Sequence, residues 1–351
     1  MSRKIKRIGI ILLILILLST AGCTILSRNQ DPISKTEFLM DTVMTIRIFD
    51  KSDEKIIDKA FNRVREIEEK MSSTLESSEI SQINNNAGIE QVKVSEETYY
   101  VLEESKRYAE LSRGAYEPTI GPLVDLWDIK GEEIERDSLP LEKDIDDKKD
   151  LVNYKKLELL EDNKVFLKEK NMKITLGGIA KGYAADEVKK VLLENGVNAA
   201  IIDLGGNVIA QGIKKDDRPW IIGIQNPFEV TGKHIATVEV KDKSIVTSGY
   251  YERYFKYNNK IYHHIIDRET GYPAENEIAG VSIISDKSID GDALSTTLFV
   301  LGLEKGKELI RSFEGIEAIF ITKDNEIYIS KNLENIFSMN ENISGFNLKT
   351  Y

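Results

Sequence analysis

One stretch, residues 172–195, constrains the fold of this chain more than any other. Its apolar beginning, Met172–Leu176, predicts a strand, and a helical pattern then continues to about Asn195. Three glycines and Lys181 separate the two elements. Glycine lets a backbone approach a ligand closely, and the free N–H groups of a helix start attract anions, so the stretch predicts an anion-binding turn, most often for phosphate. A tight turn with a surface lysine fits it equally well, since the stretch matches neither GxxxxGK[ST] nor GxGxxG.

The composition is that of a globular chain, and it excludes one class of partner. The 351 residues are 41% hydrophobic and 30% charged, enough for one large domain or two ordinary ones. The net charge of −11 argues against a nucleic-acid-binding protein, which would show a basic face. Cys23 is the single cysteine, so no disulfide can form within the chain.

The N-terminus resembles a lipoprotein signal sequence. Positive residues precede a short apolar run, Ile8–Leu18, and small residues then end in Cys23. Cleavage before Cys23 and its lipidation would remove residues 1–22 and anchor the chain outside the cytoplasm, on a bacterial cell membrane, with 23–35 as a tether. Thr20 stands where such signals usually carry Leu. An uncleaved anchor helix would give nearly the same topology.

Hydrophobic periodicity predicts several helices among many strands. Ser52 is expected to cap a helix that ends at Met71 and buries one apolar face. Other helices are expected at 78–84, 95–112, 289–301 and 304–313. Strands or hairpins are expected at 35–49, 154–170, 199–204, 220–225, 234–240, 244–247, around 258–259, 261–267, 281–284 and around 323–325.

This order of elements predicts the fold class. Because no regular βαβ alternation is present, we expect an α+β fold with mixed, largely antiparallel sheets and flanking helices. Glycine-marked turns at 177–182 and 205–206 indicate two sub-lobes around a central cleft. We expect one domain over residues 36–335 and a polar C-terminal tail over residues 336–351.

Candidate metal ligands and a candidate base follow in the last third of the chain. Asp292 and Thr296 are four residues apart, so on a helix they share a face and suit Mg²⁺, although an aspartate at a helix start is also an ordinary N-cap. His263 and His264 are adjacent on an expected strand, so at most one can face a given cleft. Together with Lys181, these residues indicate phosphoryl chemistry, with Mg²⁺ at the phosphate oxygens and a base at a hydroxyl.

Eight ordered stretches between about residues 36 and 330 together resemble the FAD:protein FMN transferase family, the ApbE flavin transferases. They are Met40–Thr42, Met71–Ser81, Gly114–Val124, Leu176–Asp186, Asp203–Asn207, Thr247–Gly249, His264–Pro273 and Asp292–Thr296. The resemblance implies an ApbE-like, T-fold-related fold. It also implies Mg²⁺-dependent transfer of FMN from FAD to a Ser or Thr hydroxyl of a target flavoprotein, which forms a phosphoester and releases AMP.

The resemblance also implies roles for individual residues. His264, Lys181 and Asp292 would be catalytic, with His264 as the base. The metal would be held by Asp292, Thr296 and the backbone carbonyl of Gly178, with Ser295 adjacent. FAD would contact Met40, Ala115, Tyr116, Glu117, Thr175, Lys181 and Ile266.

Two positions depart from the family pattern. Thr74 stands where the family often has an aromatic residue that stacks on the flavin, and we hypothesise that Tyr116 substitutes for it. Arg268 stands where the family commonly has Pro, which we expect to change the turn only mildly.

The expected partners follow from the same resemblance. They are FAD, the membrane that holds the lipid anchor, and target flavoproteins of membrane redox complexes (quinone-reductase or Rnf-type subunits) or extracytoplasmic flavin domains. Two other functions stay open. The chain could be an FAD pyrophosphatase, with water as the acceptor in the same site, or a non-catalytic flavin-binding lipoprotein.

Overall fold

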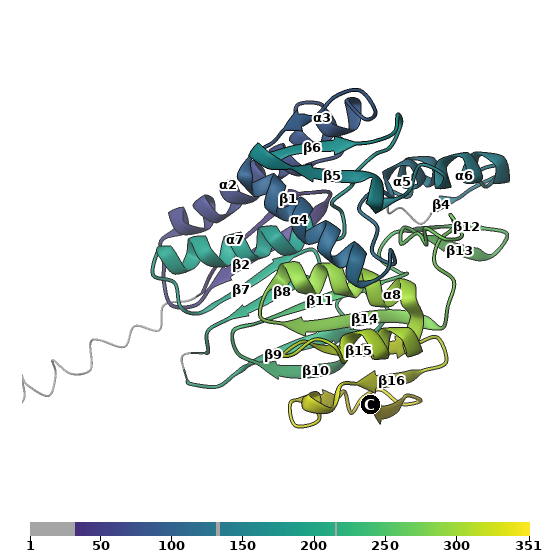
Figure 1. The fold of residues 1–351 in the computed structure, drawn as a ribbon. Coiled ribbons are helices and arrows are strands. Elements are labelled where there is room, and N and C mark those ends of the chain that lie inside the picture. Colours follow the sequence, from purple (N-terminus) through teal and green to yellow (C-terminus); the bar gives the residue numbers. More distant parts are fainter. Residues whose placement is uncertain (1–31, 131–133, 215) are drawn as a thin grey trace, which may run out of the picture.

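The computed structural model describes residues 32–130, 134–214 and 216–351 (Figure 1). The predicted signal peptide, Cys23 and most of the predicted tether lie outside these ranges. Within them, no helix is both long enough and apolar enough to cross a lipid bilayer.

A nine-stranded sheet forms the centre of the fold. Neighbouring strands are antiparallel, except that β16 and β18 at one edge run parallel. The order across the sheet is β1 (Ile33–Leu39), β2 (Thr42–Ile48), β7 (Ala200–Leu204), β8 (Asn207–Gln211), β11 (Lys243–Gly249), β14 (Ile278–Ser285), β15 (Glu317–Thr322), β16 (Glu326–Ile329) and β18 (Asn347–Thr350). The prediction of a largely antiparallel sheet is confirmed.

Long helices cover one face of this sheet (Figure 1). They are α2 (Glu54–Met71), α4 (Glu96–Leu111), α7 (Ala180–Glu194) and α8 (Ser288–Ile310). The apolar face predicted for α2 is confirmed, because each of its members is buried: Ile56, Ile57, Ala60, Phe61, Val64, Ile67 and Met71. The start of α2 lies one residue later than predicted, since Asp53 and not Ser52 caps it.

A small sheet covers the opposite face. Its strands are β9 (Trp220–Gln225), β10 (His234–Val240) and β17 (Phe337–Met339). Strand β15 shows the alternation that two covered faces require: Ala318 and Phe320 pack with the helices, whereas Ile319 and Ile321 pack with the small sheet. The fold is therefore three layers thick, with the nine-stranded sheet in the middle.

Shorter elements complete the molecule. Two more sheets have three strands each. One contains β3 (Val92–Lys93), β6 (Lys164–Leu167) and β5 (Leu157–Leu160). The other contains β13 (Lys260–His263), β12 (Tyr254–Tyr257) and β4 (Ile134–Glu135). The short helices are α3 (Glu79–Asn85), α5 (Gly121–Trp127) and α6 (Glu142–Lys149). The described residues thus form an α+β fold with seven α-helices and no closed barrel, as predicted.

The predicted strand Met172–Leu176 does not form. A single bridge joins Lys173 to Ile120, and the rest of the segment is irregular. Its backbone groups are taken by a side chain instead, because Asn84 Oδ1 accepts from Ile174 N at 2.7 Å and Asn84 Nδ2 donates to Ile174 O at 3.0 Å. Thr175 N donates to Pro118 O at 2.9 Å. The segment is held in place by contacts from two parts of the chain, Asn84 and the segment 118–120, and not by a sheet.

The predicted strand 35–49 is a hairpin, with β1 and β2 joined at Met40 and Asp41. Both turn residues adopt positive φ, 48° and 58°. Two-residue hairpin turns of this kind usually contain Gly or Asn, so the sequence carries no turn signal here. The prolonged apolar alternation across the turn made two strands look like one.

The predicted tail 336–351 belongs to the packed fold. It contains β17, which pairs with β10, and β18, which pairs with β16. Phe337 is 8% exposed and packs in the apolar core between the nine-stranded sheet and the small sheet. The apolar residues are separated by polar ones, so a hydrophobic average over this segment conceals them. In contrast, the two helices predicted on either side of Gly302 are confirmed, as α8 breaks there at a φ of 75°.

We predict that Phe337→Ala lowers the free energy of unfolding by about 3 kcal/mol, because the substitution leaves a cavity between β17 and β10. Chemical denaturation measures this change. Glu341→Ala, an exposed position in the same segment, is the control and should leave stability within about 0.5 kcal/mol of the wild type. Equal effects of the two substitutions would contradict the packed position of Phe337.

Candidate functional site

The site is built where the starts of α7 and α8 meet. Gly182, in the first turn of α7, lies against the first residues of α8. A Cβ atom at Gly182 would overlap the carbonyl oxygen of Ser288 and lie 2.7 Å from Ile289 Cα. Only glycine permits this approach, so the third glycine of the turn has a packing role.

Asp292 and Lys181 face each other across this contact. Asp292 is 3% exposed, and its Oδ2 accepts from Gly182 N at 2.8 Å. Its Oδ1 lies 3.7 Å from Lys181 Nζ, and Lys181 also donates to Gly177 O at 3.0 Å. A carboxylate, an ammonium group and the positive end of a helix dipole therefore lie together, a set of charges suited to a phosphate with a cation.

Thr296 and Gly178 lie beside this pair. Thr296 is half-buried, although the α8 residues on either side of it are buried. A Cβ atom at Gly178 would lie 3.3 Å from Thr296 Oγ1, so the Gly178 backbone is next to this hydroxyl. The structure thus brings together Gly178, Asp292 and Thr296, which the family resemblance implicates in metal binding.

Ser295, the fourth residue of that set, is oriented differently. It is fully buried, its Oγ donates to Asp292 O at 3.0 Å, and it lies 2.8 Å from Ser248 Oγ. Its hydroxyl is therefore engaged in the packing of α8 against β11. Ser295 therefore holds the backbone carbonyl of Asp292 from within the protein.

The available donors are hard oxygen atoms. Among the described residues, no group of three or more His, Cys, Asp and Glu side chains could hold a metal ion. A cation at this site would depend on one carboxylate, one hydroxyl and backbone carbonyls. Mg²⁺ accepts such a set, because it commonly takes one or two carboxylates and completes its shell with water and substrate phosphate.

His264 lies just after β13, which ends at its neighbour His263. His263 is 6% exposed, its Nε2 lies 2.9 Å from Ala274 O, and its ring packs against Phe299. His264 Nδ1 lies 3.2 Å from Arg253 O. A carbonyl oxygen can only accept, so Nδ1 carries the proton and Nε2 keeps a free lone pair. The two rings have different partners, and only His263 lies within the strand, because β13 ends there.

The surroundings of His264 keep its ring neutral. Burial lowers the pKa of His264 to about 3, and the charges of His263, Arg253 and Lys181 act in the same direction. The positive charge of Lys181, in the first turn of α7, is among the charges that disfavour the protonated form of His264. A neutral ring with a free Nε2 has a lone pair that can accept a proton, and the lowered pKa makes it a weaker base than an ordinary histidine.

Glu252 is a site residue that sequence reasoning missed. Burial among the surrounding residues raises the pKa of Glu252 to about 7, against the lowering effects of Lys181 and Arg253. The residue is nevertheless exposed to solvent over part of its surface, so crowding by neighbouring protein atoms, and not complete enclosure, accounts for the raised pKa. Its Oε1 would lie 3.9 Å from a Cβ atom at Gly206. The glycine pair 205–206 was the available signal, since it predicted a close approach without naming the neighbour.

Glu117 has a structural role for its side chain. Oε1 accepts from Thr119, and Oε2 accepts from Tyr154 N at 3.1 Å and Arg268 Nη1 at 2.9 Å. Burial raises the pKa of Glu117, whereas these donors lower it. Both carboxylate oxygens of Glu117 therefore accept hydrogen bonds from within the protein.

Arg268 is therefore more than a mild change to a turn. Besides pairing with Glu117, it packs on Gly114, where a Cβ atom would lie 2.7 Å from Arg268 Nη1. Ala115, the next residue, is half-buried, and Ile266 is 8% exposed and bridges to Pro273. The arginine thus joins two segments that the family resemblance implicates in FAD binding.

Met40 reaches the site through the β1–β2 turn. Met40 N donates to Glu68 Oε1 at 2.7 Å, and Asp41 O accepts from Arg253 Nη2 at 2.9 Å. Gly205 packs against Thr42, with no room for a Cβ atom. The turn is therefore fixed beside the segment that carries Glu252 and His264.

A cavity of about 530 Å³ opens beside the turn before α7. It is lined by Ser73, Thr74, Glu76, Ser81, Asn84, Asn85, Gly121, Val124, Asp125, Lys173, Ile174 and Thr175. Thr175 connects the cavity to the charged cluster, because its Oγ1 accepts from Gly177 N at 3.3 Å. The volume lies within the range of roughly 300–1,000 Å³ usual for small-molecule pockets.

Tyr116 does not line this cavity. It is 4% exposed, its hydroxyl lies 3.5 Å from Ser105 Oγ, and its ring packs against Tyr108 and beneath Gly178. The hypothesis that Tyr116 replaces the missing aromatic residue at Thr74 finds no free ring face here. The buried ring instead supports the Gly178 backbone.

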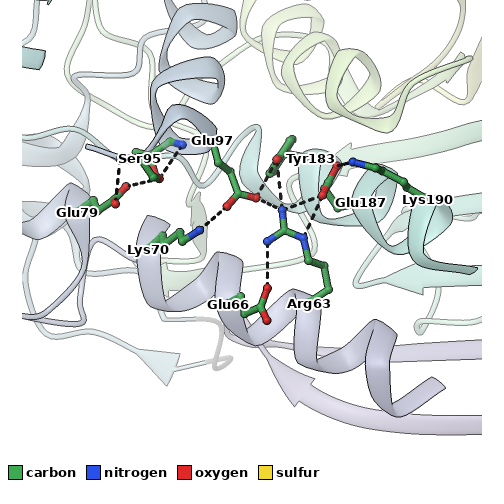
Figure 2. A network of polar contacts seen from close by, with 10 residues as sticks. Arg63, Glu66, Lys70, Glu79, Ser95, Glu97, Tyr183, Glu187 and Lys190 are labelled. Atoms are coloured by element: carbon green, nitrogen blue, oxygen red, sulfur yellow. Dashed lines mark hydrogen bonds and ion pairs between the residues drawn. The ribbon is translucent and has the colours of Figure 1, made fainter. Parts of the chain in front are cut away.

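A polar network holds the outer face of α7 (Figure 2). Arg63 of α2 pairs with Glu97 of α4 and with Glu187 of α7, donating to Glu187 Oε2 from Nη2 at 2.8 Å. Tyr183 donates to Glu97 Oε1 at 2.8 Å, and Lys70 pairs with the other oxygen of Glu97. Figure 2 shows these side chains converging from three helices. These contacts fix the rotation of α7 about its own axis. They therefore fix the direction in which the side chains of its first turn point.

Residues 40–320 match the ApbE family. The chain belongs to the ApbE family. A relative from Treponema pallidum, named FAD:protein FMN transferase, is 33% identical over 342 residues, which cover 92% of this chain and 93% of the relative. A protein of the same name from Klebsiella pneumoniae is 36% identical over 298 residues, covering 85% and 91%.

Solved structures of the ApbE family share the fold. The ApbE protein from Thermotoga maritima superposes with a TM-score of 0.78 at 31% identity, covering 87% of this chain and 99% of that one. The flavin transferase ApbE from Vibrio cholerae gives a TM-score of 0.77 at 27% identity, with the same coverage. The ApbE-like fold class predicted from the sequence is confirmed.

We predict that alanine substitution at two glycines of the same turn has different effects on stability. Gly182→Ala should lower the free energy of unfolding by about 2 kcal/mol or more, because the new methyl group overlaps α8 backbone that cannot move independently. Gly177→Ala should be tolerated, since its nearest neighbour would be Thr175 Oγ1 at an ordinary 3.6 Å. Thermal unfolding of both variants tests the close approach of α7 and α8. Similar midpoints would refute it.

We also predict that the ring of His264 does not titrate between pH 5 and 8 in the ligand-free protein, because its pKa is lowered to about 3. Nitrogen-15 NMR of the imidazole ring as a function of pH measures this, and it also reports whether Nδ1 carries the proton. A His264 signal that titrates near the ordinary value of about 6.5 would contradict the buried environment described here.

Proposed function

We propose that this chain transfers FMN from FAD to a Ser or Thr hydroxyl of a target flavoprotein, with Mg²⁺ as the required cation. The observation that carries the proposal is the meeting of Lys181, Asp292 and Thr296 at the starts of two helices, within electrostatic reach of a neutral His264. Membership in a family whose relatives are named for this reaction supports it.

Asp292 and Thr296 would hold Mg²⁺ together with the backbone carbonyl of Gly178. Ser295 would help to position Asp292, because its hydroxyl donates to the backbone carbonyl of Asp292. When bound, the cation neutralises charge on the pyrophosphate oxygens of FAD. Lys181 would supply a second positive charge to the same oxygens, and the start of α7 a third, partial one.

His264 would accept the proton of the acceptor hydroxyl at Nε2. The acceptor oxygen then forms a bond to the phosphorus of the FMN half, and the bond from that phosphorus to the oxygen that leaves with AMP breaks. The products are a phosphoester-linked flavin on the target protein and AMP. Arg253 O holds the His264 ring by its Nδ1 proton, so that Nε2 is the nitrogen available for this step.

The cavity beside the turn would accommodate the flavin half of FAD. Thr175 connects the cavity to the charged cluster, and Thr74 lines the same space. Met40, Ala115, Lys181 and Ile266 remain our proposed FAD contacts. For Tyr116 and Glu117 we propose contact through the backbone, because both side chains are engaged inside the protein.

We propose that the protein works outside the cytoplasm, anchored to a bacterial cell membrane by a lipid on Cys23. The support is the leader pattern, a basic start, a short apolar run and small residues before the cysteine. Suitable targets there are flavoproteins of membrane redox complexes, such as quinone-reductase or Rnf-type subunits, and extracytoplasmic flavin domains.

The deciding experiment is incubation of the mature chain with FAD, Mg²⁺ and a flavin-free acceptor domain, followed by mass spectrometry of the acceptor. We predict a mass increase of one FMN and release of AMP. Asp292→Ala should lower the rate about 10²- to 10³-fold, and His264→Ala about 10²- to 10⁴-fold. Chelation of Mg²⁺ should stop the reaction.

Two surface substitutions serve as controls. Asp286→Ala and His234→Ala change the same residue types at exposed positions and should leave the rate unchanged. Free FMN and AMP without labelled acceptor would instead support an FAD pyrophosphatase. Intact FAD would support a flavin-binding protein without catalytic activity.

A further inference from the structure

We propose that Asp186 is a positioning residue of this site, which sets the Asp292 and Thr296 side chains of α8 against the start of α7. The proposal rests on the proposed function, because it concerns the residues that would hold Mg²⁺ and the pyrophosphate. Asp186 lies nearly two turns into α7 and touches none of the proposed ligands. Its effect would be transmitted through α8.

Asp186 caps the neighbouring helix. Its Oδ1 accepts from Ser288 N at 2.8 Å, and its Oδ2 accepts from Ile289 N at 2.9 Å. The first N–H groups of a helix have no partner within that helix. The sequence of α8 supplies none, because its N-cap is Lys287, which makes no side-chain cap. The start of α8 is thus satisfied by a carboxylate from α7.

The reverse contact also exists. The N-cap of α7 is Ile179, which likewise makes no side-chain cap, and Gly182 N near its start donates to Asp292 of α8. Each helix therefore carries an aspartate that caps the other. We call the pair Asp186 and Asp292, with their three backbone donors, the reciprocal clasp.

The clasp fixes the geometry that the proposed chemistry needs. Two contacts in opposite directions restrain both sliding and rotation of α8 against α7, and Gly182 removes the remaining space between them. Lys181 and Gly178 belong to the α7 side, whereas Asp292 and Thr296 belong to the α8 side. The distance between the two sets is determined by how the two helix starts are held.

Capping α8 with the carboxylate of Asp186 has an energetic cost. Burial raises the pKa of Asp186 to about 6, although Ser288 N, Ile289 N and Lys189 favour its charged form. The nearby charge of Asp290 opposes it further. A serine or aspartate at the exposed position 287 would cap α8 from within the helix itself. A cap supplied from the other helix adds a connection that a local cap lacks.

Asp186→Asn tests this connection with little change in shape. The asparagine can accept one of the two N–H bonds through Oδ1, but its NH₂ group cannot accept the other. We expect the variant to fold, while its apparent affinity for Mg²⁺ in the presence of FAD falls about 10- to 100-fold, as for other residues that orient metal ligands. Calorimetric Mg²⁺ titration gives the affinity, and thermal unfolding reports stability separately.

A second substitution distinguishes positioning from capping. Lys287→Asp, added to Asp186→Asn, supplies a cap from within α8 and should restore thermal stability. It should leave the Mg²⁺ affinity low, because the link between the helices is still weakened. Recovery of the affinity together with stability would show that Asp186 is only a cap. Glu194→Gln, an exposed change on the same helix, is the matched control and should alter neither measurement.

The outcomes separate this inference from the proposed function. If the wild-type chain binds Mg²⁺ with FAD and transfers FMN, but Asp186→Asn does both equally well, only the inference is wrong. A wild-type chain that neither binds Mg²⁺ nor transfers FMN overturns the proposed function and the inference with it.

Discussion

The close approach of two helix starts is the contact on which the site depends. Gly182 lets the first turn of α7 touch the backbone of Ser288 and Ile289, and no side chain fits between them. A helix start carries partial positive charge, so two of them side by side would repel without compensation. Asp186 and Asp292 provide that compensation inside the protein. The same arrangement leaves Lys181 and an oxygen of Asp292 facing each other at the site.

The rest of the fold holds these two helices in place. The nine-stranded sheet lies beneath both of them, and α8 packs along β11 and β14. Tyr183 and Glu187 tie α7 to α2 and α4 on its outer side, as Figure 2 shows. The small sheet lies on the face opposite the helices that carry the site. Its contribution is to cover the opposite side of the central strands, so that the sheet can be apolar on both faces.

Local patterns in the sequence predicted most elements of the fold, whereas contacts between distant segments decided the exceptions. The apolar face of α2 was predictable because helical periodicity needs no tertiary information. The strand expected at 172–176 failed because Asn84, ninety positions earlier, takes its backbone groups. The β1–β2 turn was hidden because Met40 and Asp41 adopt positive φ without being Gly or Asn.

The site divides in the same way. Residue types and spacing grouped Lys181, Asp292 and Thr296, the family resemblance added Gly178, and the structure brings the four together. Glu252 and Asp186 could not be assigned roles from the sequence, since each acts on a residue that only folding places beside it. Ser295 and Glu117 were predicted as ligands or contacts, yet their side chains bond within the protein. Residue type indicated that they were polar, but not which way they point.

The pairing of Arg268 with Glu117 limits how this chain can have diverged from its relatives. Glu117 is buried, and its charge is balanced by Arg268. Replacing the arginine first would leave a buried carboxylate without its cation, which is costly. Replacing the glutamate first would leave Arg268 against Gly114 without its acceptor. The two positions are therefore expected to vary together among relatives of this chain. Sequence covariation between them would reflect the ion pair that the buried Glu117 requires.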